Sequence, residues 1–209
     1  GLYVAGPLGE DIKPFKRLPG RLVWLGSRDR ALYGITNDAP FKIAQRGRNW
    51  RVDPLGGAEA SGRPTRLDDR LYYATGENAT CFDLKAEKGL WRSSEAVSAR
   101  VSPGLDEDMA YFASADRKRL LALDRDSGNL RWAANMQHSI VFLTAGGGLI
   151  YVANDKGQVA TFSAETRRPT RSGFQLQAPV SASMLAGPAD GMLLAPSGSR
   201  IYGYDPASH

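Results

Sequence analysis

The stretch LLALDRDSGNLRW, Leu120 to Trp132, is the part of the sequence that decides the fold. Its first half has the composition of a β-strand, and the run from Asp124 to Gly128 has the composition of a turn. Three interpretations are open: a metal-binding loop, a piece of an enzyme, or one copy of a repeated structural unit. Asp124 and Asp126 alternate as calcium ligands do, but the stretch lacks the further acidic residues needed for roughly six to eight oxygen ligands. We expect instead that Asp124 and Ser127 accept backbone N–H groups in a tight turn and that Gly128 has a positive φ.

The pattern around Asp124 occurs five times along the chain. Each copy has an apolar or aromatic residue just before the anchor, a small residue before that, and a second apolar pair ten to thirteen positions upstream. The anchors are Thr36, Asp83, Asp124, Ser163 and Asp205, with spacings of 47, 41, 39 and 42 residues. The segments between them read as short strands and turns, without the apolar spacing of a helix longer than about two turns. Repeats of this length predict an all-β fold: a single β-propeller domain over residues 1–209, with five blades of four antiparallel strands.

Bulky rings and small residues predict how the blades pack. Trp91 and Trp132 each lie eight residues after their anchor, so they hold the same place in successive blades. The small residue two positions before each anchor leaves room where a neighbour's ring enters. These small residues are Gly34, Cys81, Ala122, Thr161 and Gly203.

The third copy resembles the repeat of the PQQ-like, or quinoprotein-type, β-propeller family, whose pattern is A-x-D-x-x-[ST]-G-x-x-x-W. Ala122, Asp124, Ser127, Gly128 and Trp132 match it. The resemblance implies that the motif joins the two outer strands of a blade and that the tryptophan docks against the next blade. The residues expected to do this are Asp83, Trp91, Asp124, Gly128 and Trp132. The second copy shifts its glycine to Gly89, and copies one, four and five lack the tryptophan.

The two ends of the chain suggest how the ring closes. The fifth copy stops at IYGYDPASH, before an outermost strand, and the chain opens on the strand-like GLYVAG. We predict that this N-terminal segment completes the last blade and closes a five-bladed ring, which hides two sheet edges. The alternative is part of a ring of about six to eight blades. Because no Met precedes Gly1, we expect a mature chain or a piece of a longer one.

Candidate catalytic and metal-binding residues are few. Cys81 is the single cysteine and is interpreted as a buried spacer, and His138 and His209 are the only histidines. TAGGGL, residues 144–149, is interpreted as a hairpin turn of the fourth blade, because it does not lead from a strand into a helix as a phosphate-binding loop does. The resemblance places quinoprotein cofactors in larger eight-bladed rings with an adjacent-cysteine disulfide. We therefore expect no catalytic residue, no metal and no cofactor.

Basic residues near the starts of the innermost strands suggest a binding surface. The strands are expected to start around Lys13, Arg63, Arg100, His138 and Ala178. A positive channel mouth would favour an acidic peptide, a carboxylate or an anionic glycan. It would comprise Lys13, Lys16, Arg17, Arg63, Arg66, Arg100 and His138. The competing interpretation is an ordinary solvated rim, since Lys and Arg are abundant in this chain.

The predicted function is a non-catalytic scaffold that binds another protein, one with an acidic surface if the positive mouth is the binding site. By resemblance to the outer-membrane assembly lipoproteins with PQQ-like rings, we expect a bacterial envelope setting, periplasmic or otherwise extracytoplasmic. The net charge of +5 is too dispersed for a nucleic-acid binder, and no apolar run reaches the roughly 20 residues that span a bilayer. The alternatives are a sensor domain for a sugar or small anionic molecule and a residual hydrolase or dehydrogenase.

Overall fold

The described part of the chain consists of strands and turns. The structure is a computed structural model, and it describes residues 2–4, 13–16, 18, 20–29, 31–46, 49–170, 173–180, 185–186, 192–197 and 199–205. None of these residues lies in a helix, and every strand pairing is antiparallel apart from one isolated bridge. The prediction of an all-β propeller is confirmed.

Five sheets follow one another along the chain, and each is one blade. The first contains β3 (Leu22–Arg28), β4 (Ala31–Thr36), β5 (Pro40–Arg46) and β6 (Asn49–Pro54). The second contains β7 (Thr65–Leu67), β8 (Arg70–Thr75), β9 (Asn78–Asp83) and β10 (Lys88–Ala96). The third contains β11 (Gly104–Leu105), β12 (Met109–Ala113), β13 (Arg119–Asp124) and β14 (Leu130–Asn135). The fourth contains β15 (Ile140–Gly146), β16 (Leu149–Asn154), β17 (Gln158–Ser163) and β18 (Phe174–Gln175). The fifth has three described strands, β19 (Leu185–Ala186), β20 (Leu193–Ser197) and β21 (Arg200–Tyr204).

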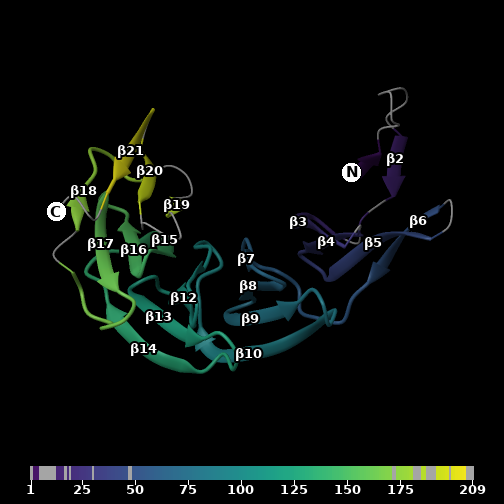
Figure 1. Ribbon diagram of the computed structural model, residues 1–209, viewed down its shortest axis with the longest axis horizontal. Helices are drawn as coiled ribbons and strands as arrows, with labels where there is room; N and C mark the ends of the chain where they lie inside the picture. The colour runs from purple at the N-terminus through teal and green to yellow at the C-terminus, as the bar shows by residue number, and fades with distance from the viewer. Residues whose placement is uncertain are drawn as a thin grey trace.

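The blades form an open arc (Figure 1). The first strands of the sheets lie toward the inside of the arc, and β10 and β14 run along its outside. β1 (Leu2–Val4) pairs with β2 (Lys13–Lys16) in a separate two-stranded sheet at the end of the arc opposite to β21. The predicted pairing of the N-terminal segment with the last blade is therefore corrected; Gly1 and Ala5 lie outside the described residues. Pairing with β2 closes a far shorter loop than pairing with β21, so it costs less conformational entropy.

The anchors of four copies occupy one place in their blades. Asp83, Asp124 and Ser163 end the third strands, and Asp205 directly follows β21, the third strand of the fifth blade. Thr36 differs because it ends β4, which is a second strand. The first copy is thus displaced by one strand. Its counterparts are Thr75, Asn154 and Ser197, which end the second strands of their blades, and Ser114, which directly follows β12.

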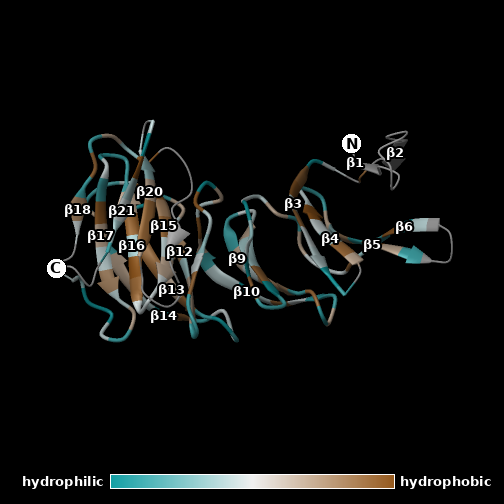
Figure 2. Ribbon diagram, turned by 45° about the horizontal axis from the view of Figure 1, so that its top comes forward, coloured by the Kyte–Doolittle hydropathy of each residue, from teal (hydrophilic) through white to brown (hydrophobic). Residues whose placement is uncertain are grey.

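The core consists of hydrophobic clusters that each join two neighbouring blades. Tyr72 and Cys81 of the second blade pack with Phe112 of the third, whereas Tyr73 of the second packs with Tyr33 of the first. Successive side chains of a strand point to opposite faces of the sheet, so the second, third and fourth blades each contact both of their neighbours. Figure 2 shows the hydrophobic residues along the strands from β12 to β20 and the hydrophilic ones at many of the turns.

The glycine-rich turn of the fourth blade is a hairpin, as predicted. β15 ends at Gly146, which pairs with Leu149 at the start of β16. Gly147 and Gly148, the two residues between them, have φ of +57° and +74°. Two positive φ values are what the tightest hairpin turns require, and glycine adopts them at little steric cost.

Candidate functional site

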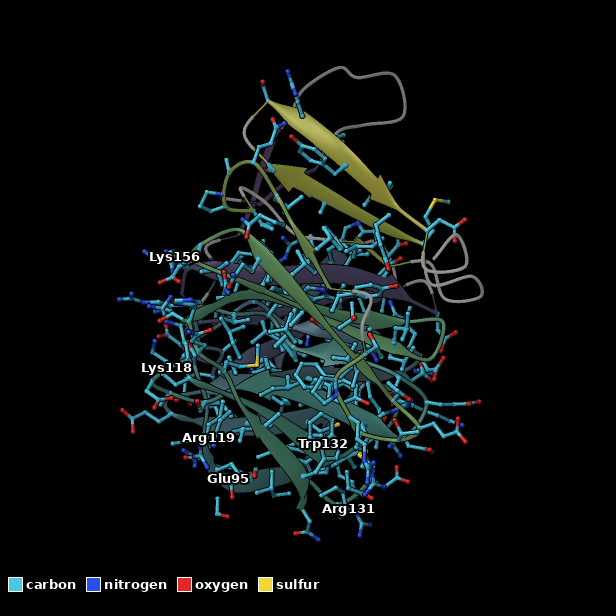
Figure 3. All side chains as sticks on the ribbon, turned by 90° about the vertical axis from the view of Figure 1, so that its left-hand side faces the viewer. Glu95, Lys118, Arg119, Arg131, Trp132 and Lys156 are labelled. Atoms are coloured by element: carbon cyan, nitrogen blue, oxygen red, sulfur yellow. The ribbon has the colours of Figure 1, made fainter. Side chains whose placement is uncertain are left out.

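The two sides of the arc differ in what they present. The turn face is the side formed by the β7–β8, β9–β10, β11–β12, β13–β14 and β17–β18 connections. The loop face is the opposite side, formed by the turns after the second strands and by the loops that enter each blade. Figure 3 shows Lys118 and Lys156, from the loop face, along one side of the sheets, with Arg131 on the other. Charged side chains of the turn face form most of the contacts described below.

The turn after Asp124 is held by the anchor side chain. Asp124 Oδ1 accepts the backbone N–H groups of Asp126 at 3.1 Å and Ser127 at 2.9 Å, and Gly128 has φ of +72°. The Ser127 hydroxyl accepts the N–H of Asn129 at 3.4 Å. These contacts confirm the expected tight turn. Asp124 Oδ2 accepts two N–H groups of Arg131, and this guanidinium, followed by Ser127, lowers the pKa of Asp124 to about 2.

Trp91 joins the second blade to the third. It lies in β10, its indole Nε1–H donates to the carbonyl oxygen of Arg125 at 2.8 Å, and its ring lies against Gly128. A Cβ at Gly128 would lie 2.5 Å from that ring, so this contact requires glycine. Cys81 is the cross-strand partner of Trp91. The small residue therefore makes room for the tryptophan of its own blade, which leans onto the next blade.

Trp132 holds the same place in the third blade, with one difference. Its ring lies 6.2 Å from the Tyr111 ring and 6.2 Å from the Phe162 ring of the fourth blade, and Ala122 is its cross-strand partner. Its indole Nε1 is buried without a hydrogen-bond partner among the described residues. The two tryptophans thus share a place and differ in one hydrogen bond.

Arg125 is the most connected side chain of the turn face. Its guanidinium donates to the carbonyl oxygens of Asp106 at 2.8 Å and Glu107 at 2.7 Å, and Nε donates to the Tyr72 hydroxyl at 3.2 Å. It also lies 3.8 Å from a carboxylate oxygen of Asp68 in the second blade. Burial, with smaller opposing effects from arginine, raises the pKa of Tyr72. Arg125 therefore fixes the β11–β12 turn and the second blade relative to the third.

Further ion pairs cross between blades on the turn face. Arg28 of the first blade pairs with Asp69 of the second at 2.6 Å. Lys42 of the first blade pairs with Glu87 of the second at 2.5 Å, which lowers the pKa of Glu87. Arg70 of the second blade pairs with Asp126 of the third. Exposed ion pairs stabilise folds weakly, but here they join turns of successive blades and restrict their relative movement.

Two adjoining hollows of about 790 and 760 Å³ form one groove on the turn face, across the second, third and fourth blades. We call it the turn-face groove. The first hollow is lined by seven carboxylates and five basic groups, and the second by five carboxylates and two basic groups. Both include Glu107 and Asp108, which are exposed and form no ion pair within the described part of the chain. The groove is acidic although the chain as a whole is basic.

The residues predicted to form a positive channel mouth do not gather in this groove. Lys13 and Lys16 lie in β2, outside the five blades, although Lys13 was expected to begin the first innermost strand, which is β3. Arg17 lies outside the described residues. Arg63, Arg100 and His138 lie in loops that enter the second, third and fourth blades, on the loop face. Arg66 instead reaches the turn face, where it donates to the carbonyl oxygens of Asp68 and Ser27. The mouth stays a prediction for Arg63, Arg100 and His138.

The structure also bears on two other candidate sites, a catalytic thiol at Cys81 and a metal-binding site. Cys81 is fully buried, and burial raises the pKa of its thiol to about 12, so it is protonated at neutral pH. Over the described residues, no group of three or more His, Cys, Asp or Glu side chains is arranged to hold a metal ion. The same residues include no helix of the length and apolar character needed to cross a bilayer.

Sequence reasoning missed Arg125 and the groove. Arg125 stands directly after the anchor, where the second copy has the buried Leu84 and the fourth has Ala164. A charge at a position that is apolar in the second and fourth copies was the available signal. The groove depends on turns that do not repeat in sequence, so no pattern pointed to it.

Solved structures with the same fold are known. The chain is similar to BamB from Moraxella catarrhalis, with 16% identity, a TM-score of 0.64, and coverage of 83% of this chain and 53% of that one. It is similar to the computationally designed Ika8 protein, with 10% identity, a TM-score of 0.65, and coverage of 88% and 58%. Hsv2 from Kluyveromyces lactis gives 13% identity, a TM-score of 0.65, and coverage of 92% and 69%. The chain thus spans little more than half of the first two, and the likeness shows the propeller fold.

Sequence comparison gives the family. No curated protein matches the chain. The family described as outer membrane protein assembly factor BamB matches twice, over residues 41–161 and over residues 77–208. These matches overlap and together include the second to fifth blades. Because they cover well over half of the sequence, the chain belongs to the BamB family of PQQ-like propellers.

Proposed function

We propose that this chain is a non-catalytic docking platform for another protein in outer membrane protein assembly, and that it works in the bacterial periplasm. The observation that carries this proposal is the family match over residues 41–208, since the family is described as an assembly factor. Fold alone does not define function, so the proposal also needs a surface suited to a protein partner.

The turn-face groove supplies that surface. It extends over three blades, and its lining includes apolar side chains, Leu67, Leu105 and Met109, beside the carboxylates. Arg125 and the ion pairs between blades hold the turns in place before a partner arrives. A surface ordered in advance loses less conformational entropy on binding.

Charge indicates the chemistry of the partner. Glu107 and Asp108 are exposed carboxylates common to both hollows, and Glu165 adds another in the second. A protein segment with Lys or Arg side chains would complement them and would be attracted at long range. The same carboxylates repel a small anionic ligand, which weighs against the sensor alternative at this groove.

The test compares two double variants. E107K/D108K reverses the groove charge, and E77K/D155K makes the same charge change at exposed turn residues of the loop face. Each protein is immobilised and exposed to an envelope extract of the organism that encodes the chain, and captured proteins are identified by mass spectrometry. We expect the wild type and E77K/D155K to capture outer membrane assembly factors and E107K/D108K to lose most of this capture.

Either of two results would contradict the proposal. Capture of no assembly factor by the wild type would remove the assembly role. Equal capture by all three proteins would keep the role and remove the groove as its site, and R63E/R100E would then test the loop face.

A further inference from the structure

The side chain of Arg125 has a defined place between the second and third blades. Its guanidinium donates to the carbonyl oxygens of Asp106 and Glu107 in the β11–β12 turn. It also lies 5.9 Å from the centre of the Tyr72 ring of the second blade, and its Nε donates to the Tyr72 hydroxyl. Two turn carbonyl oxygens of one blade and a buried tyrosine of the blade before it therefore define this place.

The third and fourth blades meet in the same way, but the residue equivalent to Arg125 is Ala164. Each directly follows the anchor of its copy. The N–H of Arg125 donates to the carbonyl oxygen of Asp108 at 3.0 Å, and the N–H of Ala164 donates to that of Gly148 at 2.9 Å. This shared contact aligns the two turns residue by residue. A methyl group therefore stands where the third blade has a long side chain that ends in a guanidinium.

The groups that contact Arg125 have counterparts around Ala164. The alignment of the turns gives the equivalent carbonyl groups, and the tyrosines match because each lies three positions before the polar residue at the end of the second strand. The equivalent pairs are Asp106 and Gly146, Glu107 and Gly147, and Tyr72 and Tyr111. Both tyrosines are fully buried. The fourth blade thus keeps the turn carbonyl groups, and the third blade keeps the tyrosine, without an arginine of the chain between them.

The second hollow of the turn-face groove lies at this place. It has a volume of about 760 Å³, and Gly146, Gly147 and Ala164 line it. Its other lining includes five carboxylates but only two basic groups, Arg125 and Arg167. Arg125 makes the contacts described above, and the exposed side chain of Arg167 forms no ion pair within the described part of the chain. The hollow therefore combines negative charge with room for a further basic side chain.

We propose that the second hollow binds an arginine side chain of the partner protein, which takes the place between the third and fourth blades that Arg125 has between the second and third. This inference rests on the proposed function and names the side chain that the turn-face groove recognises. The guanidinium donates to the carbonyl oxygens of Gly146 and Gly147, and the carboxylates of the hollow complement its charge. Arginine fits better than lysine, because a planar guanidinium donates to two oxygens at once, whereas an ammonium is a point charge.

The probes are three short peptides, acetyl-Gly-Xaa-Gly-amide, in which Xaa is arginine, lysine or citrulline, the neutral isostere of arginine. Binding to the isotope-labelled 209-residue protein is followed by the amide NMR signals of Gly147 and Gly148. We expect the arginine peptide to shift these signals saturably, the lysine peptide to bind about tenfold more weakly, and the citrulline peptide to bind more weakly still. Equal affinity for arginine and lysine would contradict the guanidinium geometry, and an arginine peptide that causes no saturable shift would overturn the proposal.

A matched pair of variants tests the place itself. A164R supplies the arginine from the chain, since it gives the fourth blade the residue that the third blade has there. We expect A164R to bind the arginine peptide about tenfold more weakly than the wild type does. A115R makes the same change at an exposed turn residue of the loop face and should bind the peptide like the wild type. Circular dichroism checks that both variants are folded, and unchanged binding by folded A164R would contradict the proposal. If A164R does not fold, the three peptides with the wild type still decide.

Capture from the envelope extract separates this inference from the proposed function. If the wild type and A164R capture the same assembly factors equally, the docking platform stands and the arginine site is wrong. If the wild type binds the arginine peptide at Gly147 and Gly148 but captures no assembly factor, the arginine site is supported and the assembly role is not.

Discussion

A buried polar side chain ends or directly follows the second strand of every blade, and its hydrogen bonds differ from copy to copy. Thr36 Oγ1 accepts the N–H groups of Asp38 at 3.2 Å and Ala39 at 3.0 Å, which holds the turn after β4. Thr75 has the same place in the second blade and is equally buried, yet its hydroxyl has no partner in the described part of the chain. A buried hydroxyl without a hydrogen bond destabilises the folded state.

This difference predicts opposite effects for the same substitution. T75V removes an unpaired hydroxyl and keeps the shape of the side chain, so the free energy of unfolding should stay the same or rise by up to about 1 kcal/mol. T36V removes an acceptor from two N–H groups and should lower it by about 1 to 2 kcal/mol. Urea denaturation of both variants and the wild type measures this. A larger loss in T75V than in T36V would contradict the assignment of their hydrogen bonds.

The anchor Asp124 predicts a pH dependence. Its pKa is lowered to about 2 by Arg131 and Ser127, so its ionised form stabilises the folded state. Since an unfolded Asp has a pKa of about 3.9, this stabilisation is complete above about pH 4 and is lost as the pH falls toward 2. D124N should lower the free energy of unfolding by about 1 kcal/mol at neutral pH, and the difference from the wild type should shrink below about pH 4.

Denaturation at several pH values measures it, with D155N at an exposed turn of the loop face as control. A difference between D124N and the wild type that is the same at pH 2 and pH 7 would show that the charge of Asp124 has no part in it.

At the scale of elements, the tryptophans of β10 and β14 occupy equivalent places in successive blades, and each contacts the next blade. Trp91 donates its indole N–H to the carbonyl of Arg125, and Trp132 has no such partner among the residues described. W91F should therefore lower the free energy of unfolding by about 1 kcal/mol more than W132F, although both remove the same ring atoms. Thermal and urea unfolding of the two variants test this. Equal losses would mean that the Trp91 hydrogen bond contributes nothing.

The strands and their order could be predicted from sequence because each blade repeats the same burial pattern. The register of the first blade could not. Gly34-Ile35-Thr36 has the small, apolar, polar order of Cys81-Phe82-Asp83, but the first ends a second strand and the second ends a third strand. Both strand ends need a polar side chain that accepts turn N–H groups, so composition alone does not separate them.

The conformation of the turns after the third strands could also be predicted only in part from sequence. Gly128 has a positive φ as its sequence predicts, but the equivalent positions are Glu87 and Arg167, with φ of +54° and +60°. Glycine at position 89 suggested that the turn of the second copy was shifted, whereas Gly89 lies in β10. In the second copy the turn conformation comes with the contacts of Glu87 to Lys42 and Tyr33 in the first blade, which no local pattern contains.

For the whole molecule, burial predicts the order in which the blades open. β13 lies between two covered faces, and its residues Leu120 to Leu123 are fully buried. β21 has one exposed face and, within the described residues, no strand on its outer edge. Backbone amides of β21 should exchange with deuterium well before those of β13, because local opening there exposes little apolar area. Equal exchange in monomeric protein would contradict this order.

The open arc also allows the blades to rotate relative to one another. Its four hydrophobic clusters each join only neighbouring blades, so a small rotation at one of these joints moves every blade beyond it as a unit. A closed ring would resist this motion, whereas in the open arc we expect the distance between β3 and β21 to vary. A partner bound between the second and fourth blades would change the distance between β3 and β21. Energy transfer between two fluorophores, one on each end blade, would measure that change.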